Sequence, residues 1–103
     1  MIAILSVTFP GHVFKQVVQA FTSPDLPKRP ESIKEIASIA YSDHDGHHAV
    51  FMLDVPDAQV AEFVTNQANR SAFISARAIG FTSSVHAGKT VVESIRDLMP
   101  LYP

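Results

Sequence analysis

Hydrophobic and polar positions recur at fixed spacings along the chain, and each spacing predicts one type of secondary structure. Residues 2–9 are rich in β-branched and aromatic side chains and stop at Pro10, which predicts a first strand. From His12 the apolar positions recur at helical spacing, so we expect a helix that ends near Pro24. Residues 24–30 contain three prolines and can continue neither element, so they predict an exposed connection.

Residues 33–41 fit two patterns. One set of spacings suits a helix, and another, the alternation of apolar residues with Ser38 and Ser42, suits a strand. We favour the strand, because an Asp-Gly hairpin signal follows at residues 45–46 and residues 49–55 then alternate again. The second and third strands should therefore form a hairpin.

The rest of the chain predicts a helix, a strand and a last helix. Pro56 opens a second helix that should run to about Arg77, with a break near residues 69–71 as an alternative. Apolar residues alternate through residues 79–86 and predict a fourth strand. A capping box at residues 90–93 precedes the terminal helix.

This order of elements predicts the α+β class. Strand, helix, strand, strand, helix and strand form the ferredoxin-like βαββαβ arrangement, here with an extra C-terminal helix. Its four strands should make an antiparallel sheet in the spatial order four, one, three, two. We expect one domain over residues 1–103, because the only linker-like stretch is too short to divide domains.

Alternation within the strands predicts two unlike faces of the sheet. The face that we expect the helices to cover consists of Leu5, Val7, Phe9, Ala37, Ile39, Ala49, Phe51, Leu53, Val55, Ile79, Phe81 and Val85. The other face mixes Ile4, Val50 and Met52 with polar residues, and it is too apolar to be left in water. We therefore expect it to meet a second copy of the chain in a homodimer.

The chain resembles the dimeric α+β barrel superfamily along nearly its whole length. The resemblance is carried by the strand at residues 1–9, the helix start at His12, the turn at residues 42–48, and the strands at residues 51–55 and 80–85. It implies two ferredoxin-like protomers packed sheet against sheet. Because the superfamily includes cofactor-independent monooxygenases, muconolactone-type isomerases, haem-dependent enzymes and stress-responsive proteins, the resemblance selects no single function.

Composition narrows the choice of partners. The formal net charge is −2 and the eight Lys and Arg residues are scattered, so we expect neither nucleic acid nor an anionic membrane as a partner. Cysteine is absent, which removes disulfides, thiolate nucleophiles and Cys-type zinc sites and fits a cytoplasmic protein. The opening segment predicts neither a signal peptide nor a spanning helix. We expect no tightly held cofactor.

The chain has five histidines, a residue type that commonly binds metals or acts as a general acid or base. His44, His47 and His48 surround the hairpin turn, and we expect His86 at the same edge of the sheet. Since two strand spacings of ~4.8 Å would separate His48 from His86, we expect no shared metal site. The alternative is a solvated turn.

His12 and Asp54 form the candidate catalytic pair. We expect the first and third strands to be adjacent and parallel, which would bring both residues to one sheet edge. A carboxylate that accepts from an imidazole orients the ring for general base catalysis. The alternative is that His12 starts a helix at the surface and Asp54 ends a strand.

Gln67 interrupts the apolar stripe of the second helix, where a large apolar residue is expected, and so leaves room for a pocket. The expected ligand-binding residues are Phe14, Phe51, Phe63, Gln67 and Phe81, which would suit a small, partly aromatic molecule. Arg70 and Arg77 could face one anion or be solvated. The sequence thus predicts a cytoplasmic homodimer that binds, and with a catalytic pair would transform, a small organic molecule. The alternative is a non-enzymatic ligand sensor or assembly module with structural or surface histidines.

Overall fold

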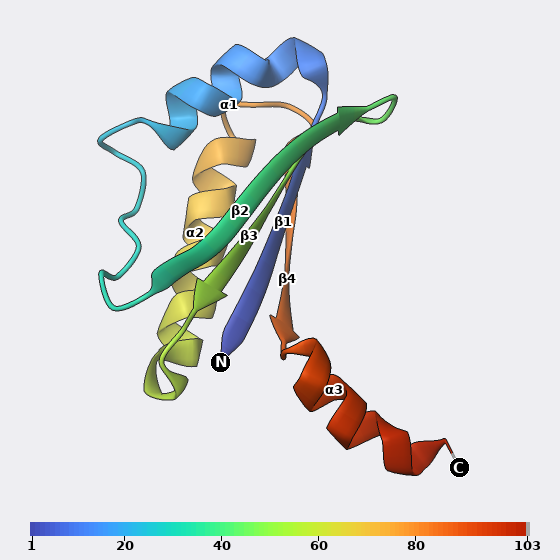
Figure 1. Cartoon of the computed structure of the whole chain (residues 1–103). Helices are drawn as coiled ribbons and strands as arrows, with labels where there is room; N and C mark the ends of the chain where they lie inside the picture. Colours follow the sequence, from blue (N-terminus) through green and yellow to red (C-terminus); the bar gives the residue numbers. More distant parts are fainter. Residues whose placement is uncertain (103) are drawn as a thin grey trace.

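The computed structural model describes residues 1–102, so Pro103 of the expected domain lies outside the described residues. A four-stranded antiparallel sheet carries two helices on one face, and a third helix extends beyond the end of the last strand (Figure 1). The elements are β1 (Ile2–Phe9), α1 (Phe14–Phe21), β2 (Lys34–Asp43), β3 (Gly46–Asp54), α2 (Val60–Ser75), β4 (Thr82–Gly88) and α3 (Val91–Leu98). The chain is therefore of the α+β class.

Several elements that the local sequence predicts are present in the structure. The segment at 34–43 is a strand, so the helical alternative is wrong, and α2 runs through residues 69–71 without a break. Gly46 has a φ of +128°, and a Cβ there would lie 2.5 Å from the carbonyl oxygen of Phe9, so the hairpin turn requires glycine. The backbone N–H of Glu93 donates to the side chain of Thr90, which caps α3 as the sequence predicts.

The sheet has the order β2-β3-β1-β4, with β1 antiparallel to both of its neighbours. Ile2 lies opposite Asp54 at one end of β1, and Phe9 lies opposite His47 at the other. The expectation that the first and third strands run parallel is therefore wrong. Because β3 and β4 both run antiparallel to β1, they are parallel to each other, and their starts lie at the same end of the sheet.

A bulge in β2 places Ala37 and Ile39 on the face opposite to the one expected. Glu35 lies opposite Leu53, but Ala37 lies opposite Met52, so one extra residue is inserted between them. The insertion turns Ala37 and Ile39 away from the helices, and Ile39 is 65% exposed. An added residue reverses every later side chain of the strand, which alternation alone does not reveal.

Ile79 also departs from its expected place. It lies in the turn before β4 and is 84% exposed, whereas Phe81 is buried directly before the strand. The fourth strand begins only at Thr82, because Gly80 with a φ of +91° ends the preceding turn.

The core consists of two clusters on the helix side of the sheet. The first gathers around Phe63 and contains Ala3, Leu5, Ile33, Leu53, Val55 and Phe63. The second lies beneath α1 and the end of α2 and contains Phe9, Val13, Val17, Ala20, Leu26, Ile74, Ala78 and Phe81. Val7 packs against both clusters, so their junction lies over the middle of β1.

The opposite side of the sheet, here called the open face, is covered by none of the helices described in residues 1–102 (Figure 1). Its apolar residues are Ile2, Ile4, Ala37, Ile39, Tyr41, Val50 and Met52. The apolar side chains of α3, Val91, Val92, Ile95 and Leu98, are also exposed. None of the helices described in residues 1–102 is long and apolar enough to cross a membrane.

Candidate functional site

A pocket of about 210 Å³ lies between the helices and the sheet, at the junction of the two core clusters. The helices contribute one wall, the strands contribute the floor, and the connection before β2 contributes Arg29. Its lining residues are Leu5, Val7, Val17, Val18, Phe21, Arg29, Glu35, Ala49, Phe51, Gln67, Arg70, Ile74 and Phe81. The walls are therefore mainly apolar, with polar groups from four residues.

Gln67 is the buried polar centre of this pocket, with only 6% of its surface exposed. Its Oε1 accepts from the Nη2 of Arg29 at 3.1 Å, and its Nε2 donates to the Oγ of Ser71 at 3.2 Å. The Oγ of Ser71 lies 2.6 Å from that of Ser83 on β4. These bonds fix the amide and, through it, one end of the Arg29 guanidinium.

Two guanidinium groups reach the same pocket. The Nη1 of Arg70 donates to the carbonyl oxygen of Pro27 at 2.7 Å. Burial lowers the pKa of Arg29, and the charge of Glu35 opposes that shift. Burial, and then the like charge of Arg29, lower the pKa of Arg70.

The structure brings together part of the predicted pocket. Phe51, Gln67 and Phe81 line it, but Phe14 and Phe63 do not. Phe63 is fully buried in its own core cluster, because its position on α2 lies one turn before the pocket. Phe14 is 51% exposed and contacts the ring of His47 at a centroid distance of 5.5 Å.

Arg29, Arg70 and Glu35 are the polar lining residues that sequence reasoning missed as pocket residues. Arg29 lies in the proline-rich connection, whose composition predicts only an exposed loop. Glu35 faces the helix side just before the bulge of β2. Arg70 was a candidate anion contact together with Arg77. Arg77 instead lies over the ring of Phe73 at 3.4 Å and is not among the pocket residues.

His12 and Asp54 lie at opposite ends of the sheet. Asp54 is opposite Ile2, whereas His12 follows Phe9, the last residue of β1. Ile2 and Phe9 are seven positions apart along an extended strand, which corresponds to about 23 Å. The expectation that His12 and Asp54 are neighbours is wrong, because it rested on parallel strands.

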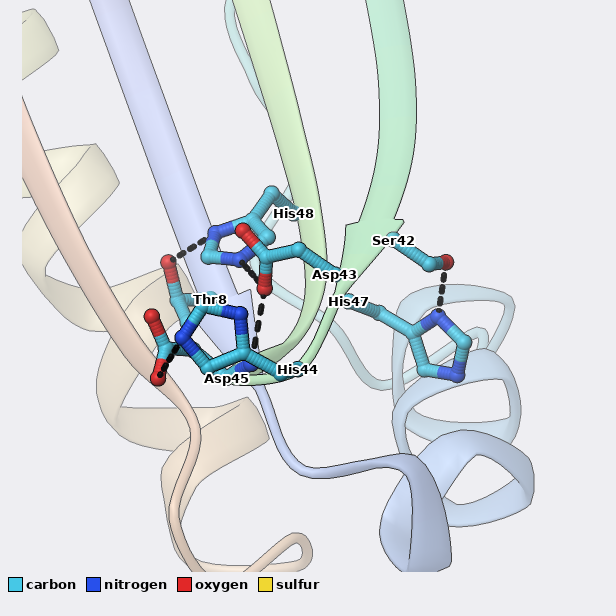
Figure 2. Close-up of polar contacts among 7 residues, drawn as sticks. All are labelled: Thr8, Ser42, Asp43, His44, Asp45, His47 and His48. Atoms are coloured by element: carbon cyan, nitrogen blue, oxygen red, sulfur yellow. Dashed lines mark hydrogen bonds and ion pairs between the residues drawn. The ribbon is translucent and has the colours of Figure 1, made fainter.

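His48 is the centre of a polar chain on the open face (Figure 2). Its Nε2 donates to the Oδ1 of Asp43 at 2.9 Å, and its Nδ1 lies 3.0 Å from the Oγ1 of Thr8. The ring of Tyr41 stacks on the His48 ring with centroids 4.7 Å apart. The hydrogen bond from His48 is the main cause that lowers the pKa of Asp43.

The other histidines point elsewhere, so the four histidines expected at the hairpin edge do not converge. His47 lies on the helix side of β3, with its Nδ1 2.6 Å from the Oγ of Ser42 (Figure 2). His44 is exposed in the turn, with its Nε2 3.6 Å from Asp45. Within residues 1–102, no three His, Asp or Glu side chains are placed to hold a metal ion.

His86 does not lie at the hairpin edge. It is opposite Ile4, whereas His48 is opposite Thr8, so the two histidines lie four positions apart along β1 in addition to the strand spacings. The expected edge was wrong because β4 runs parallel to β3, which places its end away from the hairpin.

Replacing His48 with phenylalanine should raise the pKa of Asp43 toward its ordinary value of 3.8, because the hydrogen bond that favours the carboxylate is lost. The carboxyl ¹³C shift of Asp43, followed by NMR as a function of pH, measures this change. In the folded wild type, the lowered pKa contributes stability that is present above 3.8 and is lost as the pH falls through the folded value.

The matched control is His44→Phe, since His44 is exposed and contacts Asp45 instead. It should leave the pKa of Asp43 low. Equal titration of Asp43 in wild type and in His48→Phe would show that His48 does not stabilise the carboxylate.

Comparison with known proteins assigns no function to this site. No protein-family model matches the chain, and no curated protein matches it. A solved structure of a protein from Galdieria sulphuraria, described as unknown, is 11% identical with a TM-score of 0.47 and matches 87% of this chain and 46% of its own. A DUF3240 family protein from Shewanella baltica is 13% identical with a TM-score of 0.32 and matches 86% of this chain and 96% of its own.

The chain thus spans less than half the length of the Galdieria protein. Neither similarity is close enough to assign a fold family or a function.

Proposed function

We propose that the protein binds a small, mainly apolar organic molecule in the pocket between α1, α2 and the sheet. The single observation that carries this proposal is the pocket of about 210 Å³ whose apolar walls surround the buried amide of Gln67. An apolar cavity of about 150 Å³ is large enough to bind benzene. The pocket therefore suits one ring, or a short aliphatic chain, with one polar substituent.

We further propose that the chain is a ferredoxin-like protomer of the dimeric α+β barrel type. Read from the β4 edge, its strand order is β4-β1-β3-β2, and its elements follow the βαββαβ sequence before α3. Both observations support the assignment.

The same proposal assigns the open face to a second copy of this chain. Ile39, Tyr41 and Met52 are exposed there, beside Ile4 and Val50. A twofold axis would place this patch of one copy against the same patch of the other, so two copies would cover the apolar surface. The exposed stripe of α3 adds apolar surface that the partner can also cover.

Binding is better supported than turnover. Gln67, Arg29 and Arg70 can hold a ligand by hydrogen bonds, but the candidate catalytic residues His12 and Asp54 lie at opposite ends of the sheet. The proposal is therefore a ligand-binding protein.

Titration with benzyl alcohol tests the binding proposal. The methyl and amide NMR signals of Leu5, Val17 and Ile74 should shift with a saturable dependence on concentration, because these residues line the pocket. Those of Val91, an exposed residue on α3, should not. Small ligands of this kind gain limited free energy per atom, so a millimolar dissociation constant is the expected scale.

A variant that fills the pocket provides the control. Ala49→Phe places a ring on the pocket floor and should abolish the shifts, whereas Ala61→Phe adds the same ring at an exposed position of α2 and should not. Shifts that are absent in the wild type, or that survive Ala49→Phe unchanged, would rule out this pocket as the binding site.

A further inference from the structure

The charges that line the pocket do not balance. Arg29 and Arg70 contribute two positive charges and Glu35 one negative charge, so the lining carries a net charge of one positive. The chain as a whole has a formal net charge of −2. The positive charge is therefore a local feature of the pocket.

Neither guanidinium forms an ion pair with a carboxylate in residues 1–102, and the charge of Glu35 offsets only one of the two positive charges. Two partly buried cations that repel each other are costly unless an anion compensates them. The arrangement lacks one negative charge.

Arg29 also has an unused donor. Its Nε is buried and has no hydrogen-bond partner among the described residues. A buried polar group without a partner is rare in native proteins and calls for an explanation, and a bound ligand is one. Because Gln67 already holds the Nη2 of Arg29 at 3.1 Å, the guanidinium is fixed in place before any ligand arrives.

We propose that the molecule held in this pocket is a monocarboxylic acid, bound as its carboxylate by Arg29 and Arg70, with its apolar body against Phe21, Phe51 and Phe81. This inference rests on the proposed function and names the class of ligand. Guanidinium groups bind carboxylates through paired N–H donors, which gives the contact both strength and geometry. One carboxylate also supplies the single negative charge that the lining lacks.

A phosphate ester fits this site less well. A dianion would exceed the single positive charge of the lining, whereas one carboxylate matches it. Most of the wall is apolar, which favours a ligand with one small charged group and a larger hydrocarbon body.

The experiment compares matched pairs of ligands on the wild-type protein by calorimetric or NMR titration. Benzoate, phenylacetate and hexanoate are each paired with the corresponding primary amide, which keeps size and shape but removes the charge. At least one acid should bind roughly tenfold to a hundredfold more tightly than its amide, because hydrogen bonds to charged groups are the stronger ones. Phenyl phosphate, included as a competitor, should bind more weakly than phenylacetate.

Two substitutions locate the effect. Arg29→Met keeps the aliphatic stem but removes the charge and the Nε donor, so it should abolish the preference for acid over amide. Arg77→Met removes an arginine that lies over Phe73, outside the pocket, and should keep the preference. If Arg29→Met does not fold, Arg70→Met tests the same point, and the wild-type comparison needs no variant.

The outcomes separate this inference from the proposed function. Amides that bind as tightly as their acids would overturn the carboxylate assignment and leave binding in the pocket intact. Tighter binding of phenyl phosphate than of phenylacetate would replace a carboxylate by a phosphate. If neither acids nor amides bind, both the inference and the proposed function are wrong.

Discussion

Replacing Ile39 with aspartate should convert the protein from a dimer to a monomer at micromolar concentration. Ile39 is 65% exposed in the isolated chain, so the substitution removes little from the core of the protomer. In a dimer built on the open face, the new carboxylate would be buried opposite apolar groups without a cation to pair with it. Burial of an unpaired charge costs several kcal/mol, so the dissociation constant of the dimer should rise by about a hundredfold or more.

The measurement is the molar mass in solution, by light scattering or sedimentation. Ile79→Asp is the matched control, because Ile79 is 84% exposed in the turn before β4 and is not part of the open face. It should remain dimeric. A wild-type protein that is monomeric at the same concentration, or an Ile39→Asp protein that stays dimeric, would remove the open face as the dimer interface.

Phe63→Ala should lower the free energy of unfolding by about 3 to 5 kcal/mol, which is typical for truncating a buried phenylalanine. The side chain of Phe63 is fully buried against Leu53 and Val55, and its loss leaves a cavity that the sheet and α2 cannot close. Small domains have stabilities of about 5 to 15 kcal/mol, so this single change removes a large part of the total.

Urea denaturation of Phe63→Ala and of Val64→Ala measures the difference. Val64 is the next residue of α2 but is 54% exposed, so its truncation should cost no more than about 1 kcal/mol. Because Phe63 does not line the pocket, the folded Phe63→Ala protein should still bind benzyl alcohol. Equal stability of the two variants would show that Phe63 is not the centre of its core cluster.

The parts of the fold that the sequence predicts well depend on local chemistry. The Asp-Gly pair at residues 45–46 fixes the hairpin, since a residue with φ above zero is needed there. Thr90 and Glu93 define the start of α3 through a single hydrogen bond. Gln67 predicts a pocket, because a polar side chain within the apolar stripe of a helix needs space and hydrogen-bond partners.

The parts that the sequence does not predict depend on register and on distant segments. The inserted residue in β2 keeps the alternation of residues 37–41 but exchanges its two faces, and it thereby moves Ile39 to the open face. Glu35 precedes the insertion and stays on the helix side, where it lines the pocket. Arg29 reaches the pocket only because residues 22–33 fold back over α2, where Arg29 contacts Gln67, 38 positions later in the chain. Strand direction is likewise a property of the whole sheet, and it separates His12 from Asp54.

The most direct test of the proposed function is a crystal structure of the protein grown with a saturating concentration of benzyl alcohol. The account predicts density for one ring among Val17, Phe51 and Ile74, with the hydrogen bond between Arg29 and Gln67 retained. A pocket filled by inward-turned side chains of Phe21 or Arg29, with no ring bound in it, would contradict the account.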